Sequence, residues 1–398
     1  MKYILVVGDG MADEPIAGLG NRTPLEAAIT ENMDLLARDG LVGMVKTVPD
    51  GFKPGSDVAN LNLLGYDPCL YYPGGRGPIE AASIGVELDA TDCAFRCNLV
   101  IIQDDRMEDF TSGYIDTEDA VGLIAILNTE LSNFNIHFYP GLFYRHLCVI
   151  KGKFENLKCT APHDITGKII QDYLPVGTGE ALVNKLMNRS KEILLKSKVN
   201  ARRISQGKKP VTQIWLWGHG YRVEIPAIYE KYGVRGAVIS AVDLIKGIGR
   251  LAGLEVVNVK GATGWIDTNY EGKADAALKC LQEKDFVFVH IVSTDETSHT
   301  GDVSLKIKAI EDLDKRFLGR LLNNIDANFR ILVMPDHPTP VRIKTHTSDP
   351  VPFLLYGKDV QADKAKRYSE AEAEKSGLFI REGHELLNLL IKGAIKNY

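Results

Sequence analysis

Three apolar stretches of the sequence each end in an acid that could bind a cation. YILVVGDG runs to Asp9, FVFVHIVSTD ends at Asp295, and RILVMPDH ends at Asp336 and His337. Runs rich in β-branched residues predict buried strands, and ligands gather beyond the carboxyl ends of strands in open parallel sheets. The three ends therefore predict one shared site.

Histidines extend this set of possible metal ligands. His299 follows Asp295 by four residues, so both lie on one face if a helix begins after the strand, and His346 follows in KTHTSDP. Carboxylate and imidazole ligands together suit Mn²⁺ or Zn²⁺ and, less well, Mg²⁺. Taken singly, Asp295 is also typical of a helix cap, and an isolated histidine of a solvent-facing residue. Their placement at three strand ends favours a metal site.

A candidate nucleophile lies in GFKPGSDVANLNLLGYD. Ser56 precedes a helical pattern, and a hydroxyl there faces the positive end of the helix dipole, where phosphate binds readily. A metal ion nearby would lower the pKa of this hydroxyl and make it an alkoxide. The alternative is that Ser56 only caps the helix, which is a common role for serine.

Four arginines could bind a phosphate or a carboxylate. Each stands among glycine, aromatic or apolar residues: Arg76, Arg96, Arg145 and Arg222. A guanidinium group binds such anions through two parallel hydrogen bonds, although a structural salt bridge is the alternative for each arginine. The sequence has no GxxxxGK[ST] motif, which argues against a P-loop nucleotide site.

The elements that must position these residues alternate between strands and helices. The clearest helical pattern is SLKIKAIEDLDKRFLGRLLNNI, whose apolar residues recur every three or four positions. Such alternation predicts an α/β fold with a mostly parallel sheet flanked by helices. It breaks down over 87–200, which predicts a smaller inserted α+β domain. The ranges 1–86 and 201–398 would then form one discontinuous metal-binding domain.

Composition narrows the possible partners. The 398 residues carry 47 Lys plus Arg against 52 Asp plus Glu, and this net charge of -5 argues against nucleic acid or an anionic membrane as the main partner. The N-terminal apolar run stops at Gly8, too soon for a signal peptide or a membrane span. Scattered cysteines without a paired framework are typical of reduced thiols. We expect a cytoplasmic protein.

Several motifs together resemble one known family over nearly the whole chain. VVGDGMADEP, PGSDVANLNLLGYDP, GRGPIEAASIGVEL, RCNLV, YRHL, GATGWIDTNYEGK, TDETSH and MPDHPTP resemble the archaeal-type, cofactor-independent phosphoglycerate mutases of the alkaline phosphatase superfamily. The resemblance implies an alkaline phosphatase-like core and an inserted domain that binds and closes over a small phosphorylated metabolite. It also implies interconversion of 3-phosphoglycerate and 2-phosphoglycerate with two divalent ions, usually manganese, and without bisphosphoglycerate.

The same resemblance assigns roles to individual residues. One ion would be held by Asp9, Ser56, Asp336 and His337. The other ion would be held by Asp295, His299 and His346. Ser56 would be the nucleophile that carries the phosphoryl group. The substrate-binding arginines of the family map onto Arg76, Arg96 and Arg145.

One segment departs from the family pattern and leaves alternatives open. The mutases typically have K-x-x-D-E-A-G-H-D, whereas Val292 here replaces the Lys, Ser298 the Gly and Thr300 the Asp. A Lys would stabilise the transferring phosphoryl group, so its loss puts the mutase step in question. One alternative is a homoserine kinase-like phosphotransferase of the same family. Another is a non-catalytic protein that binds a phosphorylated metabolite.

Overall fold

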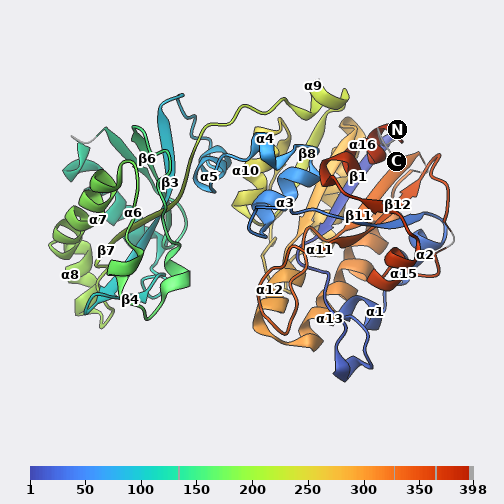
Figure 1. Ribbon diagram of the computed structural model, residues 1–398, viewed down its shortest axis with the longest axis horizontal. Helices are drawn as coiled ribbons and strands as arrows, with labels where there is room; N and C mark the ends of the chain where they lie inside the picture. Colours follow the sequence, from blue (N-terminus) through green and yellow to red (C-terminus); the bar gives the residue numbers. More distant parts are fainter. Residues whose placement is uncertain (133–134, 327, 364, 394–398) are drawn as a thin grey trace. The chain divides into compact units, whose positions relative to one another are not determined.

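The computed structural model describes residues 1–132, 135–326, 328–363 and 365–393, and its chain forms two compact units (Figure 1). Unit 1 contains Met1–Tyr72 and Glu224–Tyr398, and unit 2 contains Pro73–Val223. Both ends of the chain therefore build one unit, and the middle of the chain builds the other.

Unit 2 is wider than the range 87–200 expected for an inserted domain. Its central strand β3, Asp92–Gln103, pairs with β7, Gln213–Tyr221, which lies beyond the expected return point. Helix α5, Gly77–Ser83, packs on β3 and β7 from the other side of the expected boundary. These tertiary contacts place both flanking segments in unit 2.

Unit 1 contains a mixed sheet that is mostly parallel. Among the described residues its strand order is β13-β2-β12-β11-β1-β10-β8-β9. In chain order these strands are β1 (Lys2–Gly8), β2 (Leu41–Val45), β8 (Gly236–Ile239), β9 (Glu255–Val257), β10 (Phe286–Ile291), β11 (Phe329–Met334), β12 (Val351–Gly357) and β13 (Phe379–Ile380). Strand β1 is parallel to both β10 and β11, and β12 is antiparallel to β11 and to β2.

Helices cover both faces of this sheet (Figure 1). One face packs against α2 (Glu31–Arg38), α11 (Tyr270–Glu283) and the helical run that begins with α13 (Val303–Asp312); the other packs against α3 (Ser56–Leu63), α10 (Asp243–Leu251) and α16 (Leu386–Lys392). The remaining helices are α1 (Pro24–Ala27), α4 (Pro68–Tyr71), α9 (Ile228–Tyr232), α12 (Ser293–Thr300), α14 (Gly319–Leu322) and α15 (Glu370–Lys375). The α/β architecture predicted from the sequence is confirmed.

The amphipathic pattern after residue 303 forms one continuous helical run. It begins with α13, continues as a π-helical segment over Leu313–Leu318 and ends with α14. The repeating apolar positions Ile310, Leu313, Phe317 and Leu321 are all buried against the sheet. The 3.6-residue periodicity thus identified both the helix and its buried face.

Unit 2 has an antiparallel sheet and helices of its own. Strand β3 pairs with β4 (Arg106–Asp109), β6 (Arg145–Lys151) and β7, and β6 also pairs with β5 (Ile136–Tyr139). The helices are α6 (Thr117–Glu130), α7 (Glu180–Leu195) and α8 (Lys198–Ser205). Side chains of β3, β7, α6 and α7 share one hydrophobic core, so the unit is the expected α+β domain.

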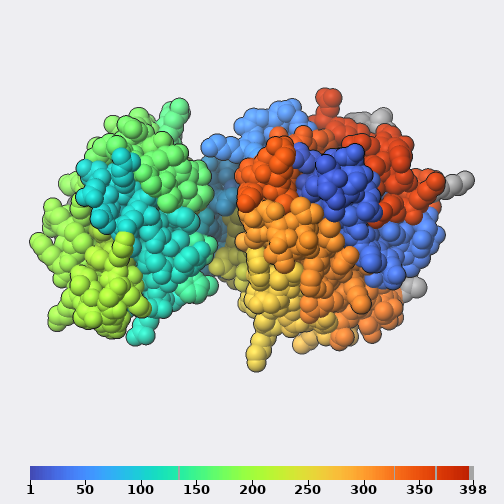
Figure 2. Space-filling view, turned by 90° about the horizontal axis from the view of Figure 1, so that it is seen from below, coloured from blue at the N-terminus to red at the C-terminus, as the bar shows by residue number. Residues whose placement is uncertain are grey.

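The N-terminal and C-terminal parts of the chain also lie together in unit 1. Figure 2 shows atoms of the N-terminal part, in blue, beside atoms of the C-terminal part, in orange and red. Pairing of β2 with β12 and β13, and hydrogen bonds from Asp13 and Thr23 to Glu370, join the two parts. Among the described residues, no helix is both long enough and apolar enough to cross a membrane.

Candidate metal centre

The carboxyl ends of three neighbouring strands bring the predicted acids together. Strands β11, β1 and β10 lie side by side in the sheet, with Asp336 after β11, Asp9 after β1 and Asp295 in the helix that follows β10. The backbone N–H of Gly10 donates to Asp336 Oδ1 at 3.0 Å. Gly10 has a φ of 60°, and a Cβ there would come within 2.4 Å of Asp295 Oδ1. Only glycine allows this close approach.

The first group of candidate ligands contains Asp9, Ser56, Asp336 and His337. His337 Nε2 lies 3.2 Å from Ser56 Oγ, 3.5 Å from Asp9 Oδ1 and 3.6 Å from Asp336 Oδ2. Asp336 and His337 are fully buried, and Ser56 is partly exposed. Four ligand-type atoms therefore converge on one small volume that the serine hydroxyl shares.

Ser56 does not cap its helix. It is the first residue of α3, and the N-cap position belongs to Gly55, which makes no side-chain cap. Helix N-terminal N–H groups and the helix dipole favour an anion at this point. The hydroxyl contacts His337 instead of the backbone. This geometry favours the nucleophile interpretation of Ser56 over the capping interpretation.

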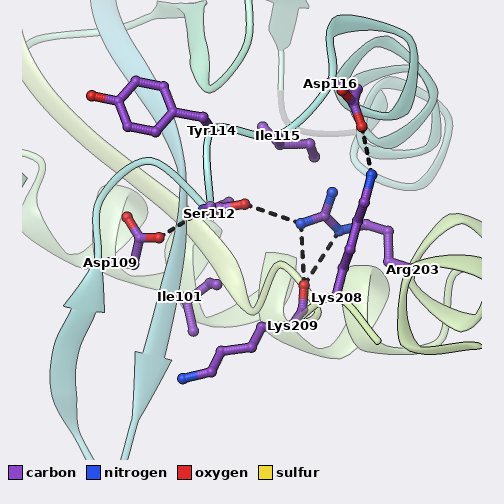
Figure 3. Close-up of a pocket in the computed structure, with 10 residues that line it drawn as sticks. Ile101, Asp109, Ser112, Tyr114, Ile115, Asp116, Arg203, Lys208 and Lys209 are labelled. Atoms are coloured by element: carbon purple, nitrogen blue, oxygen red, sulfur yellow. Dashed lines mark hydrogen bonds and ion pairs between the residues drawn. The ribbon is translucent and has the colours of Figure 1, made fainter. Parts of the chain in front are cut away.

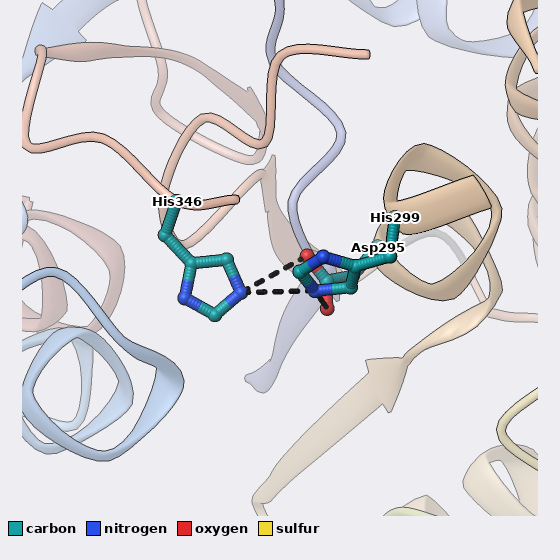
Figure 4. A group of neighbouring side chains, drawn as sticks. All are labelled: Asp295, His299 and His346. Carbon is teal, nitrogen blue, oxygen red and sulfur yellow. Dashed lines mark hydrogen bonds and ion pairs between the residues drawn. The ribbon is translucent and has the colours of Figure 1, made fainter. Parts of the chain in front are cut away.

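The second group contains Asp295, His299 and His346 (Figure 4). Helix α12 begins after β10, as the spacing required, and places His299 Nε2 3.0 Å from Asp295 Oδ2. His346 comes from the loop after β11, and its Nε2 lies 3.4 Å from Asp295 Oδ1 and 3.2 Å from His299 Nε2. The three side chains point toward one another and could hold one ion.

Thr339 connects the two groups. Its buried hydroxyl donates to Asp295 Oδ1 at 2.6 Å and lies 3.3 Å from His337 Nδ1. A hydroxyl that donates to the carboxylate can still accept a hydrogen bond from Nδ1–H. That bond would leave His337 Nε2 with its lone pair toward Ser56, as a metal ligand requires. The rings of His337 and His346 are also neighbours, with centroids 4.1 Å apart.

The two buried carboxylates of the first group, Asp9 and Asp336, have pKa values that are shifted in opposite directions. Burial, together with the charges of Asp336 and Asp295, raises the pKa of Asp9 well above its usual value. Burial also acts on Asp336, but His337 and His290 outweigh it and hold the pKa of Asp336 low. Like charges in one buried site disfavour joint ionisation unless a cation enters. The group is therefore suited to bind a metal ion.

The second group is electrostatically different. Burial raises the pKa of Asp295, but hydrogen bonds from His299 and His346 outweigh this effect and hold that pKa well below its usual value. The hydrogen bond to Asp295 raises the pKa of His299 to about 9. Burial lowers the pKa of His337 in the first group, which keeps its imidazole neutral. Neutral imidazole is the form that binds a metal.

Unpartnered buried atoms support a metal at this site. Among the described residues, Asp9 Oδ1, Asn60 Oδ1 and both ring nitrogens of His290 are buried without a hydrogen-bond partner. Buried polar atoms are usually satisfied, because leaving one without a partner costs about 1–3 kcal/mol. An ion among these groups would supply the missing partner, so the residues fit a divalent metal.

His290 is the residue that the sequence interpretation missed. It lies inside the apolar run FVFVHI, which looks like a core strand, and it is fully buried. It nevertheless forms a possible ligand group with Asp9 and Asp336. His290 is in register with Val7 on the neighbouring strand β1, and Val7 is two residues before Asp9. Because residues two apart in a strand point to the same face, strand alternation was the signal that could have placed His290 on the side of Asp9.

The substrate-binding arginines predicted from the sequence gather in unit 2. Burial lowers the pKa of Arg96, and the charges of Arg76 and Arg145, which lie close to it, lower that pKa further. Arg96 Nε is 3.1 Å from Glu80 Oε1. The same three arginines, after the larger effect of burial, lower the pKa of His163. We call Arg76, Arg96, Arg145 and His163 the arginine cluster.

Aromatic rings border the arginine cluster. The guanidinium of Arg96 lies 4.5 Å from the ring centroid of Trp217, which is also 5.2 Å from the ring of His163. Arg145 lies 4.4 Å from the ring of Tyr144 and is itself exposed. Stacked guanidinium groups keep their hydrogen-bond donors available for an anion.

A separate pocket of about 270 Å³ lies in unit 2 (Figure 3). Its charged groups are matched within the fold. Lys208 Nζ is 2.7 Å from Asp116 Oδ2, Arg203 Nη2 donates to the backbone oxygen of Ser112 at 3.0 Å, and Lys209 pairs with Glu108. These contacts connect α8 to the segment after β4, so the pocket has a structural explanation.

A buried network supports the metal-site loops from behind. Lys306 Nζ donates to Asp13 Oδ2 at 2.8 Å and to the backbone oxygen of Thr339 at 3.0 Å. Glu370 Oε1 accepts from the N–H of Asp13 at 3.2 Å, and Glu370 Oε2 accepts from Thr23 Oγ at 2.7 Å. Burial raises the pKa of Glu370 to about 7. The network joins the N-terminal loop, α13, the loop after β11 and the start of α15.

Comparisons with known proteins agree with this architecture. Residues 37–200 match a family model described as 2,3-bisphosphoglycerate-independent phosphoglycerate mutase. The mutase of that name from Methanosarcina mazei is 49% identical, over 98% of this chain and 100% of the relative. A solved Pyrococcus horikoshii protein superimposes with a TM-score of 0.83 at 31% identity, covering 98% of this chain and 97% of that one.

A second solved structure carries a functional name. It is the cofactor-independent phosphoglycerate mutase of Thermoplasma acidophilum, which matches with a TM-score of 0.68 and 27% identity. The match covers 99% of this chain and 100% of that chain. The similarity therefore extends through both units and is not confined to the metal centre.

Proposed function

Because the chain belongs to the 2,3-bisphosphoglycerate-independent phosphoglycerate mutase family, we propose that it interconverts 3-phosphoglycerate and 2-phosphoglycerate through a phosphoryl group carried on Ser56. The observation that carries the proposal is the position of Ser56. Its hydroxyl lies 3.2 Å from His337 Nε2, at a helix N-terminus and beside buried carboxylates. A weak nucleophile needs such surroundings to attack a phosphate.

The family is metal-dependent, and the residues present would hold two divalent ions. Asp9, Ser56, Asp336 and His337 would bind the first, and Asp295, His299 and His346 the second. When bound, the ions lower the pKa of the serine hydroxyl and neutralise charge on the phosphoryl oxygens. The mixture of carboxylate and imidazole ligands favours Mn²⁺, with Zn²⁺ or Mg²⁺ as the alternatives.

The chemistry of the chain itself consists of two displacements. In the first, Ser56 Oγ bonds to phosphorus of 3-phosphoglycerate, the bond from phosphorus to the glycerate oxygen breaks, and the serine proton passes to that oxygen. In the second, the hydroxyl oxygen at carbon 2 bonds to phosphorus, the bond from phosphorus to Ser56 Oγ breaks, and the proton of that hydroxyl passes to Ser56 Oγ. The phosphoryl donor is then the serine, so no bisphosphoglycerate is consumed. N–H groups at the start of α3 would face the phosphoryl oxygens of a group bound at Ser56.

The arginine cluster supplies groups that suit the rest of the substrate. Glycerate carries a carboxylate, and Arg76, Arg96 and Arg145 offer forked donors for it. The charges of these arginines act on one another, so an anion among them would relieve repulsion. We assign them the binding and orientation of glycerate.

A cytoplasmic location belongs to the same proposal, since the described cysteines are all free.

To test the proposal, the purified, Mn²⁺-loaded protein is incubated with 3-phosphoglycerate, and ³¹P NMR monitors the transfer of the phosphoryl group. We expect 2-phosphoglycerate to appear from 3-phosphoglycerate without added bisphosphoglycerate, even though Val292 replaces the family Lys. A parallel sample with ATP and homoserine should show no phosphohomoserine. The reverse pattern would identify a kinase and refute the mutase proposal. Binding without any turnover would refute both enzymes in favour of a binding protein.

The serine is tested by Ser56→Ala, with Ser304→Ala, an exposed serine on α13, as the matched control. We expect Ser56→Ala to lower turnover by roughly 10⁴-fold or more, because the nucleophile is lost. Acid quenching of the working enzyme, followed by mass spectrometry, should find phosphate on the peptide that contains Ser56. Unchanged transfer by Ser56→Ala would show that the phosphoryl group does not pass through this serine.

A further inference from the structure

We propose that the imidazole of His290 is a ligand of the first metal ion, beside Asp9 and Asp336. The inference rests on the proposed metal-dependent function, but it concerns a residue outside the motifs that identify the family. It predicts one more nitrogen ligand than His299, His337 and His346 provide.

The strand positions His290 on the correct side of the sheet. On β10 the side chains of Val289 and Ile291 belong to the core on one face, whereas the rings of Phe288 and His290 are neighbours with centroids 6.2 Å apart. Strand alternation therefore directs His290 to the opposite face. Helix α10 covers that face, because its Gly249 lies against the side chain of Val238, which is in register with Phe288. Helix α10 in turn contacts α3, whose first residue is Ser56.

The distances suit ligands of a common ion. His290 Nε2 is 3.4 Å from Asp9 Oδ2 and 4.0 Å from Asp336 Oδ2. Ligands with metal bonds of about 2.0–2.2 Å stand roughly 3 to 4 Å apart around an ion. These separations also exceed those of good hydrogen bonds, which are about 2.7–3.2 Å. His290 therefore lies at the distance expected for another ligand of the ion that Asp9 and Asp336 would bind. It is too far from either carboxylate to donate a good hydrogen bond.

Hydrogen bonding within the protein does not explain the ring. Neither nitrogen of His290 has a hydrogen-bond partner among the described residues, the two carboxylates lie only at ion-pair distance, and the side chain is fully buried. Asp336 needs no further donor, because Gly10 N, His337 N and Asn60 Nδ2 already donate to it at 3.0, 3.0 and 2.7 Å. A buried imidazole without a partner is costly. A metal bond to Nε2 would remove that cost.

A fourth imidazole would also change which metal ions the first site prefers. His290 would bind the ion held by Asp9 and Asp336, with which it forms one group of possible ligands, whereas Asp295, His299 and His346 form the group for the second ion. Imidazole ligands favour Mn²⁺, Zn²⁺ and similar ions over Mg²⁺. His290 would thus contribute to metal selectivity at the ion that contacts the serine.

The experiment counts imidazole ligands directly. Proton NMR of the full-length protein loaded with Co²⁺ shows strongly shifted, exchangeable N–H signals from each histidine bound to the ion. We expect one signal more than His299, His337 and His346 account for. The variant His290→Asn should lose that signal and keep the others. The matched control is His146→Asn, since His146 is also buried with an unpartnered Nε2 but lies in unit 2.

The outcomes separate this inference from the proposed function. A wild-type spectrum without the extra signal, or a His290→Asn spectrum identical to wild type, would overturn the inference. If His290→Asn does not fold, selective ¹⁵N labelling of histidine in the wild-type protein gives the same count, and His290→Gln gives a second variant. The count does not depend on turnover. Absence of mutase activity together with the extra signal would refute the proposed function and leave the ligand assignment standing.

Discussion

The metal centre of unit 1 and the arginine cluster of unit 2 hold their charged groups in different ways. At the metal centre, Asp336 and His337 are fully buried and the backbone donates directly to Asp336. In the arginine cluster, Arg145 is exposed, and its guanidinium lies over the ring of Tyr144. Hydrogen bonds within the protein hold the side chains of the candidate metal centre in place. In the arginine cluster, the guanidinium groups of Arg96 and Arg145 lie over aromatic rings.

The difference corresponds to what each site must do. An in-line phosphoryl transfer needs the nucleophile and its charge-stabilising groups within a fraction of an ångström, and preorganised groups cost no reorganisation during the reaction. A substrate that turns over must instead be bound and released, so side chains with room to move are tolerated. Substitutions in the two sites should therefore have different kinetic signatures.

The largest effect is expected at the metal centre itself. Asp336→Asn keeps the size of the side chain but removes its charge, so we expect turnover to fall at least about 10³-fold and Mn²⁺ to bind more weakly at one site. Isothermal titration with Mn²⁺ and steady-state kinetics measure the two effects. Asp243→Asn, an exposed acid 3.3 Å from Lys246, is the control. Normal turnover by Asp336→Asn would show that the charge of this acid is dispensable.

A smaller and different effect is expected in the arginine cluster. Arg145→Lys keeps the charge but loses the forked donors, so KM for phosphoglycerate should rise about tenfold while Mn²⁺ binding stays unchanged. Arg189→Lys, which alters an exposed arginine paired with Glu192 in the same unit, should leave both quantities unchanged. If Arg145→Lys instead lowers kcat alone or weakens Mn²⁺ binding, the assigned division between the two sites is wrong.

The sequence was enough to predict the candidate metal centre because that prediction depends on local elements. The end of a strand can be recognised in a short stretch of sequence, and the carboxyl ends of neighbouring parallel strands lie at the same edge of the sheet. Asp9, Asp295 and Asp336 could therefore be placed together from the sequence alone, and the strand order agrees. His290 could not be found in this way. Its apolar neighbours hide it within a core strand, and only the pairing of β10 with β1 brings it beside Asp9.

The bounds of unit 2 were harder to predict for a related reason. Strand β7 looks like any other apolar run, and its membership is decided by pairing with β3, more than a hundred positions earlier in the chain. Non-local pairing of this kind leaves no local signal. The division of the candidate ligands between two ions stays a prediction, since one continuous cluster joins both groups through Thr339.

Thr339 offers a way to loosen the metal centre without removing a ligand. Thr339→Val has nearly the same shape but lacks the hydroxyl between Asp295 and His337. We expect Mn²⁺ affinity and turnover to fall about tenfold to a hundredfold, as is usual when a partner of metal ligands is lost. Thr339→Ser should restore most of both, because the hydroxyl returns. Failure of serine to restore them would point to packing by the methyl group.

The smallest effect concerns the network behind the metal-site loops and appears in stability rather than turnover. Burial raises the pKa of Glu370 to about 7, above its usual 4.5. The folded protein therefore holds this proton more tightly than the unfolded chain does. The resulting stabilisation is fully present below about pH 4.5 and is lost as the pH rises through 7.

Glu370→Gln isolates this contribution. The amide can still accept from Asp13 N and donate to Thr23 Oγ, so the two hydrogen bonds of Glu370 have replacements. In chelator-treated samples unfolded by urea at pH 5 to 8, the wild type should lose about 2 kcal/mol relative to Glu370→Gln across this range, less than the full pKa shift because Glu370 is partly exposed. Glu372→Gln, whose parent pKa is lowered mainly by Lys375, should show no such decline. A constant difference between wild type and Glu370→Gln would mean that Glu370 is already ionised at pH 5, and that the network supports the loops through charge rather than through a shared proton.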